Sequence, residues 1–554
     1  MQVPSHSDMV RRMGQAPARR LILASITGLL YPLCFPDFDF GSLAWVVLVP
    51  LHLALDECPP PRAFRVGWLS GLIASVGVML WVVTAMHQYG QMPLVASYTA
   101  MVLLCAYLGV YVAVYAAFLA WLRKHTGHAC LFAAPFVWVT LELIRTYLLS
   151  GLPWALLGYS QYKWLSIIQF ADHTGVYGIS FLVVLVNVAL AEVSLRALKQ
   201  WRRQSVQTSG GDGFPWLTPS AAVLGLALAL WYGHAELQEN TGSESKEKPV
   251  AARMIQIGLV QPNIDQAKKW DAAYRRETLD RYTRLTALAA EGTALVVWPE
   301  AATPFLFEQE PEYRAEVTGL VQRLKTPLLF GSPALRYYPN GRPYLLNSAY
   351  LLSKEGRILN RYDKQHLVPF GEYIPLRFLL FFLEKLVVGI GDFEAGTIPT
   401  VFQLPAEPEG HPSKFGVVIC YEVIFPDLVR QFAFNGAEYM VTITNDAWFG
   451  ASAAPYQHFT MVVFRAVENR VAFARAANTG VSGFIDPRGR ILLATPTFQE
   501  VSVKGDISIS RTLTFYTGHG DVFAFGCVII TGLLLIATRR RARRAASVVG
   551  EQHA

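Results

Sequence analysis

The sequence predicts a two-part protein, a helical membrane domain of about eight spans and a soluble domain of the α/β class. Three observations predict it. Apolar residues make up 53% of the 554 residues and charged residues only 16%, whereas soluble domains usually carry about 25% charged residues. Long apolar runs are concentrated in 1–235, while 245–515 has the composition of a globular domain. Basic residues cluster beside apolar runs, as in the arginine-rich tail 539–544, which is typical of membrane proteins.

Eight apolar segments are candidate spans, because about 20 mostly apolar residues cross a bilayer. They are 20–36, 42–55, 66–86, 94–122, 131–149, 177–197, 218–235 and 520–538. The first two are short, and Pro32 and Pro36 can break them into a hairpin. With the N-terminus inside, every loop expected in the cytoplasm carries Arg or Lys, whereas the outer loop 87–93 carries none. The positive-inside rule therefore predicts cytoplasmic termini and a soluble domain on the opposite side of the membrane.

The predicted domain boundaries follow from these spans. Residues 1–235 form the membrane domain with spans one to seven, 236–252 a polar linker, 253–515 the catalytic domain, and 516–554 the last span and the basic tail. Within the catalytic domain, short apolar runs alternate with helical patterns, which favours an α/β domain with a buried sheet. The expected strands are 254–261, 294–298, 327–330, 415–419 and 439–444, and the clearest expected helix is 457–477.

Charge and cysteine content exclude several classes of function. The net charge of +7 comes largely from clusters beside apolar runs, not from a basic face of the soluble domain, so nucleic-acid binding is not expected. Of the six cysteines, only Cys420 lies in the soluble region, so that region cannot form an internal disulfide. No CxxC or His-rich spacing indicates a metal site, and we expect neither a metal nor another cofactor.

Three polar residues follow predicted strands or loops in a pattern that indicates covalent catalysis. Glu300 ends the segment ALVVWPE, Cys420 ends the strand FGVVIC, and Lys364 lies in RYDKQHLVPFGEYIP. Ligands of open α/β sheets bind beyond the carboxyl ends of strands, so Glu300 and Cys420 can share one pocket. Each residue alone has an ordinary structural interpretation. Cys420 could be a small core residue, Glu300 an acid in a turn and Lys364 a solvated lysine. Together they form a far more specific pattern.

The chemistry of acyl transfer explains these residue types. A thiolate is a strong nucleophile, but a free thiol near pKa 8.5 is mostly protonated at neutral pH. A carboxylate such as that of Glu300 can take the thiol proton. The ammonium of Lys364 can stabilise the oxyanion, aided by the backbone N–H of Tyr421.

Residues 298–300 (WPE), a lysine followed by Pro-Phe-Gly-Glu, and a strand ending in Cys-Tyr-Glu resemble the nitrilase superfamily of carbon–nitrogen hydrolases. Further matching segments are 260–270, 346–350, 444–450, 465–470 and 477–483. The resemblance implies an α-β-β-α sandwich with a catalytic triad of Glu300, Lys364 and Cys420. Such a domain placed before the last of about eight spans resembles the membrane-bound N-acyltransferase branch, as does the segment 151–162 (GLPWALLGYSQY).

This branch implies a two-step reaction. Cys420 would take a fatty acyl chain from a phospholipid as a thioester. The α-amine of a diacylglyceryl-modified N-terminal cysteine on an apolipoprotein would then accept the chain. The implied location is the bacterial inner membrane, with the catalytic domain on the periplasmic side. An enzyme that draws two lipid substrates from the bilayer needs such spans, whereas a soluble hydrolase does not.

Further residues are candidates for supporting roles. Glu372 could hold Lys364 or help to move a proton, and Glu422 could orient the loop after the nucleophile or be a surface acid. Substrate contacts are expected from aromatic and apolar residues, each of which could instead only pack the protein; these are Trp154, Trp270, Trp448, Phe449, Leu379 and Phe382. The last two belong to the apolar segment 376–391, which is either a core helix or, as we prefer, an arm that touches lipid. Glu142 and Arg145 share a helical face within a predicted span, as a functional or a structural pair.

Two other functions compete with this prediction. A membrane-tethered hydrolase of the amidase type would use the same triad with water as acceptor. A transporter or lipid scaffold with a decayed enzyme domain would carry a broken triad, whereas this triad is complete. The sequence therefore favours the acyltransferase.

Overall fold

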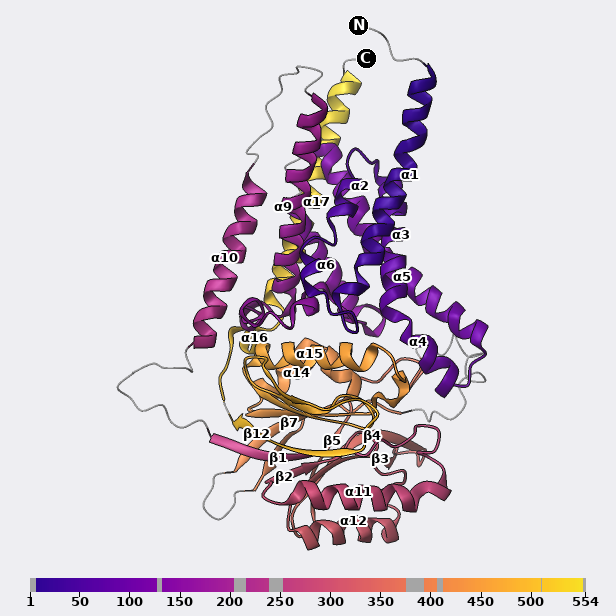
Figure 1. The fold of residues 1–554 in the computed structure, drawn as a ribbon, viewed down its shortest axis with the longest axis vertical. Helices are drawn as coiled ribbons and strands as arrows, with labels where there is room; N and C mark the ends of the chain where they lie inside the picture. The colour runs from indigo at the N-terminus through magenta and orange to yellow at the C-terminus, as the bar shows by residue number, and fades with distance from the viewer. Residues whose placement is uncertain are drawn as a thin grey trace, which may run out of the picture.

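The computed structural model describes residues 6–126, 132–203, 216–238, 253–374, 393–405, 412–509 and 511–551. The protein consists of two parts stacked along its long axis (Figure 1). The helical domain comprises 6–238 and the last helix, and the α/β domain comprises 253–509. The start of the first helix and the end of the last helix both lie at the end remote from the sheets (Figure 1).

The helical domain is built from long helices joined by short ones. Its elements include α1 (His6–Leu30), α2 (Val49–Ala54), α3 (Pro60–Met79), α4 (Trp81–Thr84), α5 (Leu94–Thr126), α6 (Ala134–Tyr147), α7 (Leu165–Ile168), α8 (Ala171–Thr174), α9 (Val176–Arg203), α10 (Leu217–Gln238) and α17 (Val522–Glu551). Helix α10 continues three residues beyond the predicted start of the linker at 236. Most of that linker, 239–252, lies outside the described residues.

Four helices among the described residues are long and apolar enough to cross a membrane: Leu94–Thr126, Val176–Leu198, Leu217–Gln238 and Val522–Arg543. A fifth candidate is the pair Pro60–Met79 and Trp81–Tyr89, bent by 50°. The predicted count of eight spans is therefore not confirmed. Helix α6 has only 14 residues, or about 21 Å at the rise of an α-helix, which is less than the roughly 30 Å of a bilayer core. The apolar helix at Gly41–Ala54 is also short.

Small residues let the two central helices of the helical domain approach closely. A Cβ atom on Gly71 of α3 would lie 2.8 Å from the Cα atom of Gly109 of α5, and one on Gly67 would lie 2.6 Å from the carbonyl oxygen of Val112. Such contacts are typical of helix pairs in membranes, where packing rather than the hydrophobic effect drives association. Helix α3 leads directly into α4, which carries Trp81 to the boundary with the α/β domain.

Among its described residues, the α/β domain contains two six-stranded sheets, with strand orders β12-β1-β2-β3-β4-β5 and β11-β10-β9-β8-β7-β6. The strands are β1 (Arg253–Gln261), β2 (Leu295–Val297), β3 (Leu328–Tyr337), β4 (Pro343–Leu352), β5 (Ile358–Asp363), β6 (Val401–Leu404), β7 (Ser413–Ile419), β8 (Tyr439–Thr444), β9 (Ala472–Ala477), β10 (Gly483–Ile485), β11 (Ile491–Ala494) and β12 (Val501–Ile509). All five strands expected from the sequence are present, as β1, β2, β3, β7 and β8. Parallel pairing joins β1 to β2 and β7 to β8.

Helices cover the outer faces of both sheets (Figure 1). Helices α11 (Arg275–Ala290) and α12 (Pro311–Leu324) cover the first sheet, whereas α14 (Pro426–Phe434) and α15 (Ala454–Asn469) lie between the second sheet and the helical domain. Every residue of α15 except Tyr456 is buried. The helix expected over 457–477 is wrong at its end, because Arg470 caps α15 in the left-handed conformation and 472–477 form β9.

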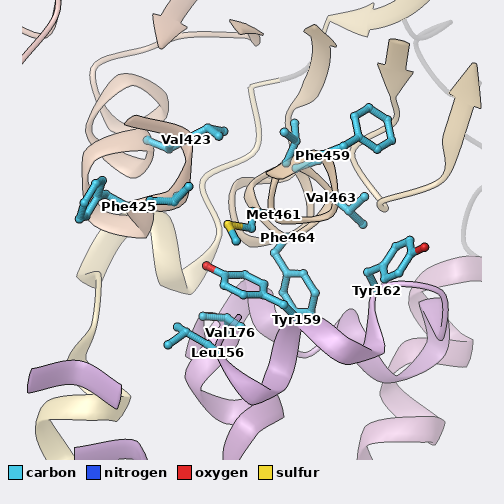
Figure 2. Close-up of a cluster of buried hydrophobic side chains, with 14 of the residues drawn as sticks. Leu156, Tyr159, Tyr162, Val176, Val423, Phe425, Phe459, Met461, Val463 and Phe464 are labelled. Atoms are coloured by element: carbon cyan, nitrogen blue, oxygen red, sulfur yellow. The ribbon is translucent and has the colours of Figure 1, made fainter. Parts of the chain in front are cut away.

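The hydrophobic core continues from one domain into the other. Figure 2 shows Leu156, Tyr159 and Val176 of the helical domain facing Met461 and Phe464 of α15. The rings of Tyr159 and Phe464 meet edge to face, with centroids 5.1 Å apart. The α/β domain is therefore packed onto the helices as part of one core.

Candidate active site

Glu300, Lys364 and Cys420 follow the ends of strands that come from both sheets. Glu300 lies three residues after β2, Lys364 directly follows β5, and Cys420 directly follows β7. All three side chains are buried. The Nζ atom of Lys364 lies 3.2 Å from Oε1 of Glu300, and the charges of both groups act on the thiol of Cys420. The structure thus brings together the three residues that the sequence singles out.

Lys364 lies between two carboxylates. Its ammonium also lies 3.0 Å from Glu372, and the amide Nδ2 of Asn347 donates to both Glu300 and Glu372 at 2.7 Å. Sequence reasoning did not single out Asn347, although it lies within the matching segment 346–350. The second oxygen of Glu372 accepts from the N–H of Val368 at 2.8 Å. Glu372 is therefore a second carboxylate that holds Lys364 in place.

The surroundings of Glu300 keep it ionised. Burial by itself raises the pKa of this carboxyl, but the charge of Lys364, the hydrogen bond from Asn347 and the charge of Lys269 hold the pKa below its usual value. The backbone N–H of Asn445 donates to its Oε2 at 2.9 Å. The Nζ atom of Lys269 donates to the carbonyl oxygen of Glu300 at 3.1 Å. Lys269 was also missed, although it lies within the matching segment 260–270, and burial lowers its pKa to about 8.

Cys420 occupies a strained position at the start of the turn Cys420–Ile424. Its φ is +51°, a left-handed conformation that is uncommon for residues other than glycine. Burial and the negative charge of Glu300 raise the pKa of its thiol, against the opposing effect of Lys364. The resting thiol is therefore protonated, and its attack requires a base.

Glu422 joins the turn of Cys420 to the segment of Lys364. Its carboxylate accepts from the N–H of Ile419, the hydroxyl of Tyr362 and the N–H of Gln365, each at 2.7 Å. Burial raises its pKa to about 7. Glu422 is fully buried, so it is not a surface acid.

Contacts from the helical domain reach the same turn. The hydroxyl of Tyr421 donates to the carbonyl oxygen of Gly151 at 3.0 Å. The ring of Trp154 is buried beside Trp81, at 4.9 Å, and beside Phe449, at 6.0 Å between centroids. Two of the candidate substrate residues, Trp154 and Phe449, therefore lie together at the boundary between the domains.

The other candidate substrate residues are placed differently. Trp448 is half-buried, with its ring 5.9 Å from that of Tyr89, and Trp270 is 49% exposed. Leu379 and Phe382, with the rest of 376–391, lie outside the described residues.

Glu142 and Arg145 line one cavity inside the helical domain, together with Trp154. One oxygen of Glu142 accepts from the indole of Trp138 and from the N–H of Leu157, both at 2.9 Å. Arg145 donates to the carbonyl oxygen of Trp154 at 3.4 Å. Both residues of this predicted pair thus support the segment that carries Trp154. In the part of the chain that the structure describes, no group of three or more His, Cys, Asp and Glu side chains is arranged to hold a metal ion.

Comparison with known proteins agrees with this architecture. Residues 27–189 match the model of the apolipoprotein N-acyltransferase N-terminal domain, and residues 256–513 match that of carbon-nitrogen hydrolases. The apolipoprotein N-acyltransferase of Geobacter metallireducens is 41% identical, over 95% of this chain and 96% of its own length. The chain belongs to the apolipoprotein N-acyltransferase family. It is thus an acyltransferase of the carbon–nitrogen hydrolase superfamily.

Other apolipoprotein N-acyltransferases match over nearly the whole chain. The Chlorobaculum tepidum enzyme is 32% identical over 95% of this chain and 98% of its own length. The Azotobacter vinelandii enzyme is 33% identical over 95% of this chain and 96% of its own length. Among solved structures, an amidase of the nitrilase superfamily from Nesterenkonia AN1 is 22% identical with a TM-score of 0.34, over 47% of this acyltransferase and 92% of the amidase. A Saccharomyces cerevisiae protein of branch 10 of the superfamily is 21% identical with a TM-score of 0.35, over 48% of this chain and 95% of its own.

Proposed function

We propose that this enzyme transfers a fatty acyl chain from a phospholipid, through a thioester on Cys420, to the α-amine of the N-terminal diacylglyceryl-cysteine of an apolipoprotein. One observation carries this proposal. A buried, protonated thiol shares its site with an ionised carboxylate and an ammonium group, at the face of the α/β domain that packs on the helical domain. Relatives that match nearly the whole chain are named apolipoprotein N-acyltransferase.

In the first step, Cys420 attacks the ester carbonyl of the phospholipid. As the S–C bond forms, the thiol proton passes to Glu300, which is ionised because its pKa is held low. The oxygen of the tetrahedral intermediate carries the negative charge, and Lys364 with the N–H of Tyr421 stabilises it. The C–O bond then breaks, and Glu300 returns its proton to the leaving oxygen of the lysophospholipid.

In the second step, the α-amine of the acceptor attacks the thioester carbonyl. A proton of the amine passes to Glu300, the C–S bond breaks, and the proton is returned to the sulfur of Cys420. The product is an amide, and the thiol is regenerated. Because the same carboxylate serves both steps, Glu300 must alternate between base and acid.

The position of the site favours a lipid donor over a soluble amide. Tyr421 and the helical segment of Gly151 are in direct contact, so the nucleophile lies against the domain that carries the candidate spans. In agreement with the charge distribution of the sequence, we place the α/β domain on the periplasmic side of a bacterial inner membrane and both termini in the cytoplasm. Water would be the acceptor in the competing amidase.

The test is the mass of Cys420 after the protein has been incubated with phospholipid vesicles. We expect a mass increase of one acyl chain on the Cys420 peptide, and its loss when a labelled diacylglyceryl lipopeptide is added, with an N-acyl product. Cys420→Ala should form neither adduct nor product. Cys420→Ser should form little or none, because a hydroxyl is harder to ionise. Cys58→Ala, which removes another buried thiol, serves as the matched control and should retain activity.

Two results would contradict the proposal. Substantial N-acylation by Cys420→Ala would show that another group is the nucleophile. Release of free fatty acid in place of the N-acyl lipopeptide would identify a hydrolase.

A further inference from the structure

A cluster of buried polar residues contacts the backbone of Cys420 and is not part of the proposed triad. It consists of His458 of α15, Asp446 of the turn Asp446–Phe449, and Arg475 of β9, all of which are fully buried. The Nε2 atom of His458 lies 3.1 Å from the carbonyl oxygen of Cys420. Three charged or ionisable groups in the core require a reason, because burying them is costly.

The partners of His458 decide which ring nitrogen carries the proton. A carbonyl oxygen only accepts, so Nε2 must be the N–H that donates to Cys420. This bond requires a proton on Nε2 whether the ring is neutral or charged. The Nδ1 atom lies 3.1 Å from Oδ1 of Asp446 and 3.0 Å from Nη2 of Arg475, and Nη2 also donates to Asp446 at 2.8 Å. Asp446 and Arg475 therefore hold the Nδ1 side of the ring, so that Nε2 faces the carbonyl oxygen of Cys420.

The hydrogen bond from His458 to the carbonyl oxygen of Cys420 also affects the orientation of the next N–H group. In a planar trans peptide, the C=O of one residue and the N–H of the next point in opposite directions. A donor that holds the carbonyl of Cys420 therefore also fixes the direction of the N–H of Tyr421. The same bond opposes relaxation of Cys420 from its left-handed φ of +51°.

Trp154 of the helical domain also packs against the imidazole of His458. The ring of Trp154 stacks on that of His458, with centroids 5.8 Å apart and planes at 27°. The indole N–H of Trp154 donates to Gln457, the neighbour of His458, at 2.7 Å. Trp154 therefore packs His458 in the rotamer that reaches Cys420.

We propose that His458 is a positioning residue, which holds the Cys420–Tyr421 peptide so that the N–H of Tyr421 points at the oxyanion of the tetrahedral intermediate. The inference rests on the proposed function, because it assumes that Cys420 is acylated. It assigns Asp446, Arg475 and Trp154 to the support of this one hydrogen bond.

The test compares two reactions of Cys420 in the full-length protein. A water-soluble activated ester acylates the thiol through an oxyanion, whereas iodoacetamide alkylates it by direct displacement without one. The ratio of the two rate constants therefore reports the oxyanion donors and not the folding of the site. Glutamine can place an amide N–H near the position of the imidazole Nε2, and asparagine cannot reach it, so His458→Gln and His458→Asn form a matched pair.

We expect the acylation-to-alkylation ratio to fall by about 10- to 100-fold in His458→Asn and His458→Ala, since one oxyanion donor is worth about 10²–10³ in rate. His458→Gln should recover most of the ratio. An unchanged ratio in His458→Asn, or parallel loss of both reactions in all three variants with lowered thermal stability, would overturn the positioning role. Failure of the wild-type protein to acylate Cys420 at all would instead refute the proposed function.

Discussion

At the scale of single residues, the ionisation of Glu300 depends on the two lysines near it. Lys364 contacts the side chain of Glu300, whereas Lys269 contacts its backbone oxygen. Both positive charges lower the pKa of Glu300, and that of Lys364 has the larger effect. A low pKa keeps Glu300 in its base form at neutral pH, which the proposed first proton transfer requires.

Replacing Lys364 with methionine should shift the low-pH side of the pH–rate profile to higher pH. Without the ammonium, the pKa of Glu300 rises, so the base form is lost at a higher pH. The rate on the plateau should also fall by about 10²–10³, because one oxyanion donor is missing. The measurement is the pH dependence of Cys420 acylation by a soluble activated ester.

Lys269→Met is the matched control for this experiment, because it removes a buried lysine whose charge has a smaller effect on Glu300. Its acid limb should move in the same direction but less far. An acid limb that stays in place in Lys364→Met would show that Glu300 is not the base whose ionisation limits the reaction.

At the scale of secondary structure, α15 connects the candidate active site to the helical domain. One side of the helix presents His458 to the turn of Cys420, and another presents Phe464 to Tyr159. A helix buried on all sides is unusual for a soluble domain. It is explained here by the packing of α15 between a sheet and a second domain (Figure 1).

Phe464→Ala should weaken the packing between the domains. Truncation of a buried phenylalanine typically costs about 3–5 kcal/mol, and Phe464 is fully buried. We expect a lower midpoint of thermal unfolding in detergent and faster proteolysis near the domain boundary. Leu288→Ala on α11, where the side chain is 61% exposed, is the control and should change the midpoint little. Equal midpoints for the two variants would contradict this account of α15.

At the scale of the whole molecule, polar contacts as well as apolar packing join the two domains. Arg470 at the end of α15 forms an ion pair with Asp172 of α8 at 2.6 Å, and Glu468 accepts from the N–H of Val176 at 3.0 Å. Arg470, Asp172 and Glu468 are buried, so separating the domains would break these contacts at a cost in free energy.

The arrangement of the helices predicts the sides of the membrane on which the loops lie. The end of α9 lies with the start of α1 and the end of α17, away from the α/β domain (Figure 1). A reporter fused to a chain that ends within 204–212 should therefore report the cytoplasm, and one fused after Glu239 should report the periplasm. Paired alkaline phosphatase and green fluorescent protein fusions measure this. The opposite result at either position would overturn the proposed orientation.

The sequence by itself determined the two-part architecture and five strands of the α/β domain, and it predicted that Glu300, Lys364 and Cys420 share one site. Each depends on local information, because apolar periodicity and residues that end strands can be read within short windows. The number of spans was not determined, since apolar composition does not distinguish a spanning helix from a short buried one such as α6.

Only the tertiary structure decided which residues surround the proposed triad. Asn347, Lys269 and His458 come from distant segments, and nothing in their local sequence shows that they meet Glu300 or Cys420. The end of α15 was misjudged for a related reason. In 470–477 the residues are buried whether they continue a helix or form a strand, and only pairing of β9 with β8 settles the choice. Burial and pairing are properties of the assembled chain, because they depend on contacts between residues far apart in sequence.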